Sequence, residues 1–368
     1  MALSGKGFFI WKIPDCEGGN PTAIADVAKA ARLSHVCIKI ADGPYIYNYD
    51  KVNKKDLVPA VVTALHKKGI QAWGWHYIYG YDPVGEARMA VQRCVGLNLD
   101  GYIIDAEGEF KNPGKDVAAR TFVKEFRRSL PNFPVALCSY RYPSYHPQFP
   151  WAAFLERSNF NMPQVYWEQS HNAGAQLKRS YKEFQGIAPV RPYMATGPTY
   201  YVSGWAPTVS DINDFLNTAK SLKIPAVNFF SWDYARRSLK PLWDAVANFS
   251  WDAAPPPPVK DLPELLMIAL NTRDGTIASS LYGVDSIFIT ANKTIQGNEA
   301  IRLHYIEFFT KTLLNATFKL TGTSGSGNSR HFTWTASGTN GVIKNGNDTI
   351  GIMDGKIVYH YTSFTVTK

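Results

Sequence analysis

Two acidic side chains stand at the end of an apolar run that is typical of a buried β-strand. The run reads Asp100-Gly-Tyr-Ile-Ile-Asp105-Ala-Glu107. Residues two apart on a strand point to the same face, so we expect Asp105 and Glu107 to lie side by side. Two carboxylates in one low-dielectric site cannot both ionise freely. The carboxyl whose pKa rises becomes a proton donor near neutral pH.

Such a pair suits glycoside hydrolysis, which needs a proton donor beside the leaving oxygen. We predict Glu107 as this general acid. The alternative, in which the acids bind a metal or cap a helix, is less favoured because the preceding run is so apolar. Glu109 is a rival acid, but we expect it to be solvated beyond the strand end. Glu168 allows a different mechanism, as a carboxylate nucleophile or base opposite Glu107.

Eight apolar strand-like runs precede residue 252, and they predict an α/β fold of the (β/α)8 TIM barrel type. The expected strands are Phe8–Ile13, His35–Ala41, Ile70–Ile78, Gly101–Glu107, Val135–Tyr140, Met162–Trp167, Val190–Ala195 and Ala226–Trp232. The expected helices between them include Thr22–Leu33, Lys55–Lys68, Pro83–Gly96, Asp116–Ser129 and Val209–Lys223. A doubly wound sheet is less favoured because no GxGxxG or Walker motif follows a strand.

Four consecutive prolines, Pro255–Pro258, predict a domain boundary, because such a run favours a stiff spacer. We therefore expect a catalytic barrel at residues 1–251, a Pro-rich linker at 252–259 and a small β-rich accessory domain at 260–368. Polar and apolar residues alternate in the last part, over 342–353 and 355–366. A Gly/Ser-rich loop is expected at Gly322–Ser329 and one helix near Ala300–Leu314.

Three segments carry a family resemblance. Asp100-Gly-x-x-Ile-Asp105-x-Glu107 resembles the strand-four signature of family 18 chitinases, with Ile103 where a further Asp is usual. The run His35–Gly43, and Gly74-Trp-His-Tyr-Ile-Tyr with the helix that carries Glu86, resemble strands two and three of family 25 lysozymes. The fourth strand of those lysozymes also ends in Asp-x-Glu. The resemblance spans most of residues 5 to 249.

The resemblance implies a retaining hydrolase of an N-acetylhexosamine polymer, peptidoglycan first and a chitin-like polymer next. The N-acetyl group of the substrate would assist the reaction, with Glu107 as acid/base and Asp105 stabilising the acetamido group. Family 25 enzymes carry a strand-one Asp, where this chain has Phe9, and Asp15 lies in the following loop. This departure favours an alternative, namely a non-catalytic carbohydrate-binding or structural barrel of a phage or cell-surface assembly.

The carboxyl ends of the other strands supply partners for the acid pair, because catalytic groups of such barrels stand there. Asp233 is a third catalytic candidate, with a salt bridge to Arg236 or Arg237 as the alternative. We expect a tyrosine hydroxyl to hold the acetamido carbonyl and Trp232 to stack under a sugar ring. The candidate substrate-binding residues are Tyr77, Tyr140, Gln164, Tyr166, Trp232 and Trp75. For each aromatic residue the alternative is packing inside the barrel. His76 is expected to be a buried, hydrogen-bonded histidine.

Composition limits the partners. Aromatic residues reach 14% and the net charge is +9. A basic surface suits nucleic acid, anionic lipid or an anionic cell wall, but no Lys/Arg run resembles a nucleic-acid arm, so no nucleic-acid partner is expected. No apolar stretch is long enough for a membrane span. Nothing indicates an oligomeric state.

The cysteines and histidines predict neither a metal site nor a cofactor. Cys16, Cys37, Cys94 and Cys138 match no zinc or CxxC spacing, and Cys37 and Cys138 are expected to be buried. A metal-dependent hydrolase is a third class, but the spacing of the histidines does not suggest it. No secretory signal is recognised. We expect synthesis in the cytoplasm and action on the cell wall after release, as in a phage-type endolysin.

Overall fold

The structure is a computed structural model that describes residues 3–251 and 260–368. The described residues form two compact units. Of the described residues, the first unit contains 3–90, 99–127 and 131–251. The second contains Val91–Asn98, Arg128–Leu130 and the chain from residue 260 onward. The expected linker, residues 252–259, lies outside the described residues.

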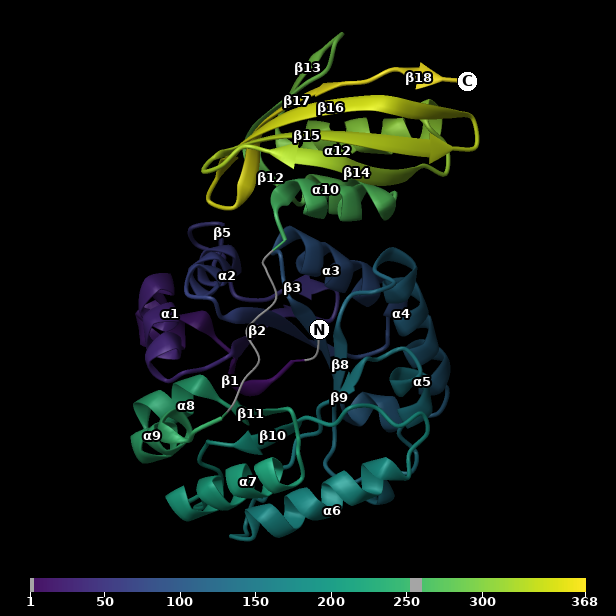
Figure 1. Ribbon diagram of the computed structural model, residues 1–368. Helices are drawn as coiled ribbons and strands as arrows, with labels where there is room; N and C mark the ends of the chain where they lie inside the picture. The colour runs from purple at the N-terminus through teal and green to yellow at the C-terminus, as the bar shows by residue number, and fades with distance from the viewer. Residues whose placement is uncertain (1–2, 252–259) are drawn as a thin grey trace. The chain divides into compact units, whose positions relative to one another are not determined.

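A curled parallel sheet forms the centre of the first unit (Figure 1). Apolar residues fill its strands because both faces are buried. β3 (Tyr45–Ile46) pairs antiparallel with the end of one strand. The eight parallel strands follow the order β10 (Ala195–Pro198), β11 (Ala226–Phe230), β1 (Gly5–Ile10), β2 (His35–Asp42), β6 (Gln71–Ile78), β7 (Gly101–Ala106), β8 (Val135–Cys138) and β9 (Phe160–Asn161).

Beyond β9 the chain continues in single parallel bridges. Asn161 bridges Tyr193, and Gln164 bridges both Tyr140 and Thr196. Backbone hydrogen bonds from Asn161 N to Pro192 O and from Val165 N to Thr196 O flank Pro163. Proline has no N–H to donate at the intervening position. The expected strand Met162–Trp167 is therefore reduced to β9 and isolated bridges.

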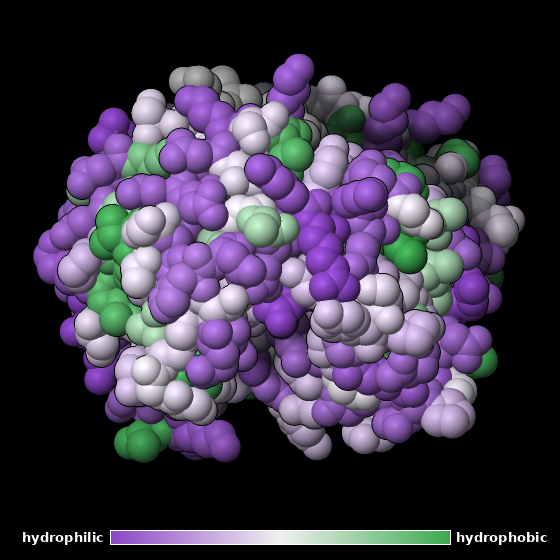
Figure 2. All heavy atoms as spheres, turned by 90° about the horizontal axis from the view of Figure 1, so that it is seen from below, coloured by the Kyte–Doolittle hydropathy of each residue, from purple (hydrophilic) through white to green (hydrophobic). Residues whose placement is uncertain are grey.

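Helices lie outside the curled sheet (Figure 1). Their starts carry local signals, such as the Asn20 cap before Pro21 and the Thr208–Asp211 capping box. Figure 2 shows that the face on the side of α6 and α7 is mainly hydrophilic, with small, scattered apolar patches. The helices are α1 (Pro21–Ala30), α2 (Val58–Lys67), α3 (Pro83–Gly96), α4 (Lys115–Ser129), α5 (Trp151–Leu155), α6 (Ala173–Gln185), α7 (Val209–Ser221), α8 (Trp232–Arg237) and α9 (Lys240–Asn248).

Large aromatic side chains fill the inner face of the sheet. Phe9, Trp73 and Trp75 belong to one buried cluster. Gly101 begins β7 beneath Trp73, and a Cβ atom there would lie 2.5 Å from the indole ring. All four cysteines are buried thiols, which confirms the expectation for Cys37 and Cys138.

The mixed α/β architecture with a parallel sheet is confirmed, but several strand boundaries besides that of the sixth differ. The first strand spans Gly5–Ile10 instead of Phe8–Ile13, because Ile13–Asp15 forms a 3-10 turn, and the fifth ends at Cys138 instead of Tyr140. The seventh strand begins at Ala195 instead of Val190. The eighth ends at Phe230, because Ser231 becomes the residue before α8 and Trp232 its first residue. An acid in a first helical turn, here Asp233, is a helix-start signal that outweighs the apolar run. The helix expected from Lys55 begins at Val58, since Lys55–Asp56 forms β5 against β4 (Tyr49–Asp50).

The second unit is β-rich, as expected, but it also contains helices that were not expected. α10 (Leu262–Asn271) and α11 (Gly275–Ser279) precede its sheet. The helix expected near Ala300–Leu314 is present as α12 (Asn298–Glu307), which continues into a π-helical segment, Phe308–Thr312. The Gly/Ser-rich loop expected at Gly322–Ser329 is shorter in the structure, because the preceding strand extends to Ser324. The sheet order is β13 (Thr294–Gln296), β12 (Tyr282–Ile289), β17 (Lys356–Ser363), β16 (Gly341–Met353), β15 (Ser329–Gly338) and β14 (Thr317–Ser324), with β18 (Val366–Thr367) beside β16.

Within the two described ranges, no helix combines the length and apolar character needed to cross a membrane.

Candidate functional site

The acid pair stands where β7 ends. Asp105 is 8% exposed and lies opposite Tyr77 of β6 and Cys138 of β8 in the sheet register. Glu107 follows the last strand residue and is partly exposed. The side-chain amide of Gln164 donates to Glu107 Oε1 at 2.9 Å and to Asp105 Oδ1 at 3.2 Å. The structure therefore brings these three predicted residues together.

The environment of the pair favours a proton on Asp105. Burial raises the pKa of the Asp105 carboxyl well above its usual range, and the charge of Glu107 and a hydrogen bond with it raise this pKa further. The positive charge of Lys39 lowers the pKa of Asp105. The sequence predicts the proton on Glu107, whereas the raised pKa belongs to Asp105. The raised pKa of Asp105 favours a proton shared within the pair.

Three predicted tyrosines surround the acids. Burial, followed by nearby carboxylates, raises the pKa of Tyr77 above the usual range and that of Tyr140 to about 12. Burial also raises the pKa of Tyr166 well above its usual value, with smaller contributions from Cys138, Tyr200 and the two acids. Their hydroxyls therefore remain neutral donors at working pH. Tyr77 donates to Glu109 Oε2 at 2.8 Å. Glu109 lies beyond the end of β7 and is partly exposed, so it contacts solvent as expected but also accepts this hydrogen bond.

A buried cation, Lys39 on β2, was missed by the sequence analysis. Its ammonium group lies 2.5 Å from Asp42 Oδ2 and over the rings of Tyr47 and Trp75, at 4.3 and 4.8 Å from their centroids. Tyr79 donates to the other oxygen of Asp42 at 2.7 Å. A lone lysine within an apolar strand run was the signal that could have found this group, because such a charge needs a partner when buried.

The aromatic residue that ends β11 and remains partly exposed is Phe230. Its ring centroid lies 6.2 Å from Trp75, 6.3 Å from Trp11 and 6.4 Å from Tyr166. Trp75 itself is buried and donates its indole N–H to Ile10 O at 2.9 Å. Phe230 therefore has a free surface near the predicted tyrosines, and the sequence analysis did not single it out.

Trp232 is fully buried, so it has no exposed ring face to stack against a sugar. It packs against Phe8 and Trp243, with ring centroids 6.3 and 4.7 Å apart. Its indole nitrogen lies 3.3 Å from Glu17 Oε1. The prediction of Trp232 as a stacking platform is corrected by its position at the start of α8, which directs the ring into the packing between that helix and α9.

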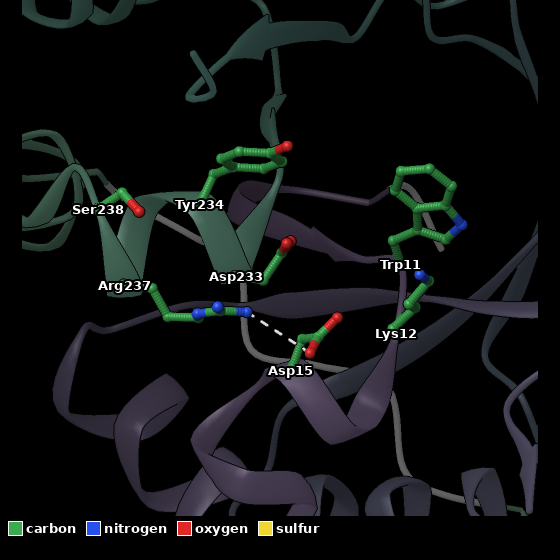
Figure 3. Close-up of a pocket in the computed structure, with 7 residues that line it drawn as sticks. All are labelled: Trp11, Lys12, Asp15, Asp233, Tyr234, Arg237 and Ser238. Atoms are coloured by element: carbon green, nitrogen blue, oxygen red, sulfur yellow. Dashed lines mark ion pairs between the residues drawn. The ribbon is translucent and has the colours of Figure 1, made fainter.

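Asp233 lines a hollow of about 230 Å³ (Figure 3). It accepts a 2.5 Å hydrogen bond from Ser231. The alternative was a salt bridge from Asp233 to Arg236 or Arg237. Arg236 instead pairs with Glu17 at 2.7 Å, and Arg237 pairs with Asp15 at 3.5 Å. Its proximity to the reacting centre therefore stays a prediction.

Two remaining candidates have defined partners. His76 is fully buried, with Tyr102 at 2.9 Å from one ring nitrogen and the carbonyl of Gly43 at 2.7 Å from the other. It is thus the satisfied histidine that was expected. Glu168 is exposed and accepts a hydrogen bond from Tyr200. Over residues 3–251 and 260–368, no group of three or more His, Cys, Asp or Glu side chains could hold a metal ion.

No family model matches the chain, and neither does any curated protein. Among solved structures, an NTF2-like protein of unknown function from Cytophaga hutchinsonii is 14% identical over 27% of this chain and 83% of its own, with a TM-score of 0.24. An LEH-like epoxide hydrolase of Mycobacterium tuberculosis is 14% identical over 28% and 79%, with a TM-score of 0.24. A de novo designed protein with a curved β-sheet is 13% identical over 28% and 81%, with a TM-score of 0.25. At such TM-scores neither fold nor function follows for this chain.

Proposed function

We propose that the first unit is a (β/α)8 barrel that hydrolyses glycosidic bonds in an N-acetylhexosamine polymer. The eight parallel strands and the outer helices support the barrel. The bridges from Asn161 to Tyr193 and from Gln164 to Thr196 support closure, because they join the segments of β9 and β10 at the two ends of the strand order. Peptidoglycan is the first candidate substrate and a chitin-like polymer the second.

The observation that carries this proposal is the pairing of Asp105 and Glu107 at the end of β7, where the amide of Gln164 donates to both carboxyl groups. In the resting site the proton lies on Asp105. Its transfer to Glu107 makes Glu107 the acid that protonates the leaving oxygen. Asp105 is then an anion that accepts a hydrogen bond from the acetamido N–H, while the acetamido oxygen attacks the anomeric carbon. The hydroxyls of Tyr140 and Tyr166 supply neutral donors for the acetamido carbonyl, since the hydroxyl of Tyr77 already donates to Glu109.

The wider assignment is also part of the proposal. The β-rich second unit would hold the enzyme on an insoluble polymer and so raise its effective concentration there. A net charge of +9 suits an anionic cell wall. We propose action at the wall after release from the cell, as for a phage-type lysin.

A non-catalytic carbohydrate-binding barrel is the second candidate. The observation that favours it is Phe9, which occupies strand one where family 25 enzymes have an Asp and which is packed into the buried cluster. Under this alternative the aromatic residues would bind sugar, and the acid pair would only orient it.

Release of reducing ends from purified peptidoglycan and from chitin tests the proposal. We expect turnover by the wild type and a loss of about 10²- to 10⁴-fold in Glu107→Gln. Glu156→Gln is the matched control, because Glu156 is exposed and pairs with Arg120 at the surface, and it should keep most of the activity. If the wild type binds the polymer but releases no reducing ends, the carbohydrate-binding alternative replaces the hydrolase.

A further inference from the structure

The hollow of about 230 Å³ lies between α8 and the loop that follows β1, and Figure 3 shows the side chains around it. Two cations, two carboxylates and two aromatic rings line it, namely Lys12, Arg237, Asp15, Asp233, Trp11 and Tyr234. The formal charges of this lining cancel. A ligand with a single sign of charge would therefore meet attraction and repulsion of similar strength, whereas a ligand with both signs can pair each charge.

Helical spacing presents one charge of each sign from α8. Asp233 lies in its first turn and Arg237 in its last, four residues apart, so both stand on one side of the helix. An acid and an arginine at this spacing attract each other across one turn, a rise of about 5.4 Å. Among the residues that the structure describes, no ion pair joins Asp233 to Arg237, and Arg237 extends to Asp15 instead (Figure 3). The two charges of α8 are thus available to separate ends of a ligand.

Arg237 has only a weak partner in the protein. It lies 3.5 Å from Asp15, which is longer than the distance of about 2.7–2.9 Å in a charge-assisted hydrogen bond. The two side chains are 64% and 41% exposed. The neighbouring Arg236 shows the contrast, because it donates to the two carboxylate oxygens of Glu17 at 2.7 and 3.2 Å. Arg237 can therefore exchange Asp15 for the carboxylate of a ligand without breaking a strong bond.

Asp233 and Lys12 also have unused capacity. The hydroxyl of Ser231 donates to Asp233 Oδ1 at 2.5 Å. Over residues 3–251 and 260–368, no other group donates to this carboxylate, and Lys12 forms no ion pair. The ammonium group of Lys12 lies 5.4 Å from the ring centroid of Trp11. A carboxylate has about four acceptor sites and an ammonium group three donors, so both can bind a further partner.

Two aromatic rings stand on two sides of the hollow (Figure 3). Trp11 is 39% and Tyr234 38% exposed. Each ring also packs against the protein, since Trp11 lies 6.3 Å from Phe230 and Tyr234 lies 6.5 Å from Tyr200. Rings held in this way present apolar surface without being ordered by a ligand. They suit a short carbon chain between two charged ends.

The size and charge of the hollow select among ligands. Pockets for drug-sized molecules have volumes of about 300–1,000 Å³, so this smaller hollow suits one or two amino-acid residues. A simple anion such as phosphate would meet two carboxylates as well as two cations. An uncharged sugar would take water from four charged groups and return no ionic partner. A zwitterion supplies a partner for both signs.

We propose that this hollow binds a peptide end that carries an ammonium group and a carboxylate. The carboxylate lies at Arg237, with Lys12 beside it. The ammonium group lies at Asp233, with Asp15 beside it. This binding does not depend on the hydrolase function, but its consequence for the substrate does. Peptidoglycan carries peptides with such ends and chitin does not, so the hollow would make the proposed hydrolase prefer peptidoglycan.

Titration of the full-length wild type with Nα-acetyl-lysyl-alanine, followed by ligand-observed NMR, tests the proposal. This probe has a side-chain ammonium group and a terminal carboxylate. Amidation of its carboxylate, or acetylation of its ammonium group, should weaken binding about fivefold, as expected for a partly exposed ion pair. Absence of binding, or equal binding of the charged and capped probes, overturns the proposal. Displacement of the probe by di-N-acetylchitobiose would assign the hollow to a sugar and also overturn it.

Two variants locate the charged ends. In Arg237→Gln the free acid and the amide should bind equally, and in Asp233→Asn the free amine and its acetylated form should bind equally. Arg120→Gln is the matched control, because Arg120 is an exposed arginine that pairs with Glu156 away from the hollow. It should keep both preferences. If Arg237→Gln and Asp233→Asn have native circular dichroism and also keep both preferences, the proposal is wrong.

Release of reducing ends from peptidoglycan, with and without its peptides, separates this proposal from the hydrolase function. The wild type should prefer the peptide-bearing polymer, and Arg237→Gln should reduce that preference. If the wild type binds the probe but releases no reducing ends from either polymer, the hollow stands and the hydrolase fails. If the wild type cleaves the polymer but does not bind the probe, the hollow fails and the hydrolase stands.

Discussion

Gln164 donates a hydrogen bond of 2.9 Å from Nε2 to Oε1 of Glu107. The donor is positioned by bridges to Tyr140 on one side and Thr196 on the other, so it stands between two strand segments of the sheet. Because the same nitrogen also lies 3.2 Å from Asp105, it fixes the orientation of both carboxyl groups.

Loss of this amide should slow catalysis without unfolding the protein. A hydrogen bond to a charged group contributes about 1.5–3 kcal/mol, which corresponds to about a 10- to 100-fold fall in kcat/KM for Gln164→Leu. Steady-state hydrolysis of a soluble oligomer measures the effect. Gln185→Leu, an exposed position at the end of α6, is the control. Full activity in Gln164→Leu would show that the amide does not orient the acid.

Asp105 should make stability depend on pH. Folding raises its pKa, so the folded chain retains a proton at pH values where the unfolded chain, with a pKa of about 3.9, has lost it. The stability is fully present below about pH 4 and falls as pH rises through the folded-state pKa. Asp105→Asn removes this loss, because a neutral amide can still accept from Gln164 and donate to Glu107.

The melting temperature of Asp105→Asn should therefore exceed that of the wild type by a margin that widens from about pH 4 upward. Each unit of pKa shift corresponds to about 1.4 kcal/mol. Thermal unfolding followed by circular dichroism over this pH range is the measurement. A constant difference between the two proteins at every pH would contradict a raised pKa at Asp105.

Phe230 and Trp232 should have separable roles. Phe230→Ala removes a partly exposed ring near Tyr166, so we expect kcat/KM to fall by about tenfold, with a smaller change in stability. Trp232→Phe leaves a cavity beside Trp243 and should cost about 1–3 kcal/mol in the free energy of unfolding, with kcat/KM nearly unchanged. Oligomer hydrolysis and urea unfolding of both variants check this. The reverse pattern would restore Trp232 as the stacking residue.

The residues that the sequence predicted best are those fixed by local geometry. Asp105 and Glu107 share a site because side chains alternate along a strand, and the apolar run before them identifies that strand. Gln164 was found for the same reason. Its hydrogen bonds were not, because they depend on bridges across Pro163 to residues far away in the sequence.

The errors also have physical causes. Ser231 and Asp233 start a helix, and this local signal ended the eighth strand early and turned Trp232 into the packing behind the sheet. Lys39 was missed although its partner Asp42 is only three residues away, because the ring of Trp75 is brought against its ammonium group only by the pairing of β2 with β6. The helix α10 could have been predicted, since Asp261 and Glu264 form a capping box before an apolar run.

The second unit offers a prediction about its own stability. Asp348 accepts hydrogen bonds from His360 Nε2 at 2.8 Å and from Thr362 at 2.6 Å, and all three side chains are buried. Tyr282 lies 2.5 Å from the other ring nitrogen of His360. Asp348→Ala leaves two buried donors without an acceptor, and each such loss costs about 1–3 kcal/mol.

We therefore expect Asp348→Ala to destabilise the second unit by about 2–6 kcal/mol while the first unit keeps its stability. Hydrogen exchange read by mass spectrometry separates the units, since protection should fall in β15, β16 and β17 and remain in β6 and β7. Asp285→Ala, an exposed position on β12, should leave protection unchanged. If Asp348→Ala kept full protection in β16, the buried network would contribute little to this fold, and the sheet would owe its stability to apolar packing around residues such as Phe332 and Ile350.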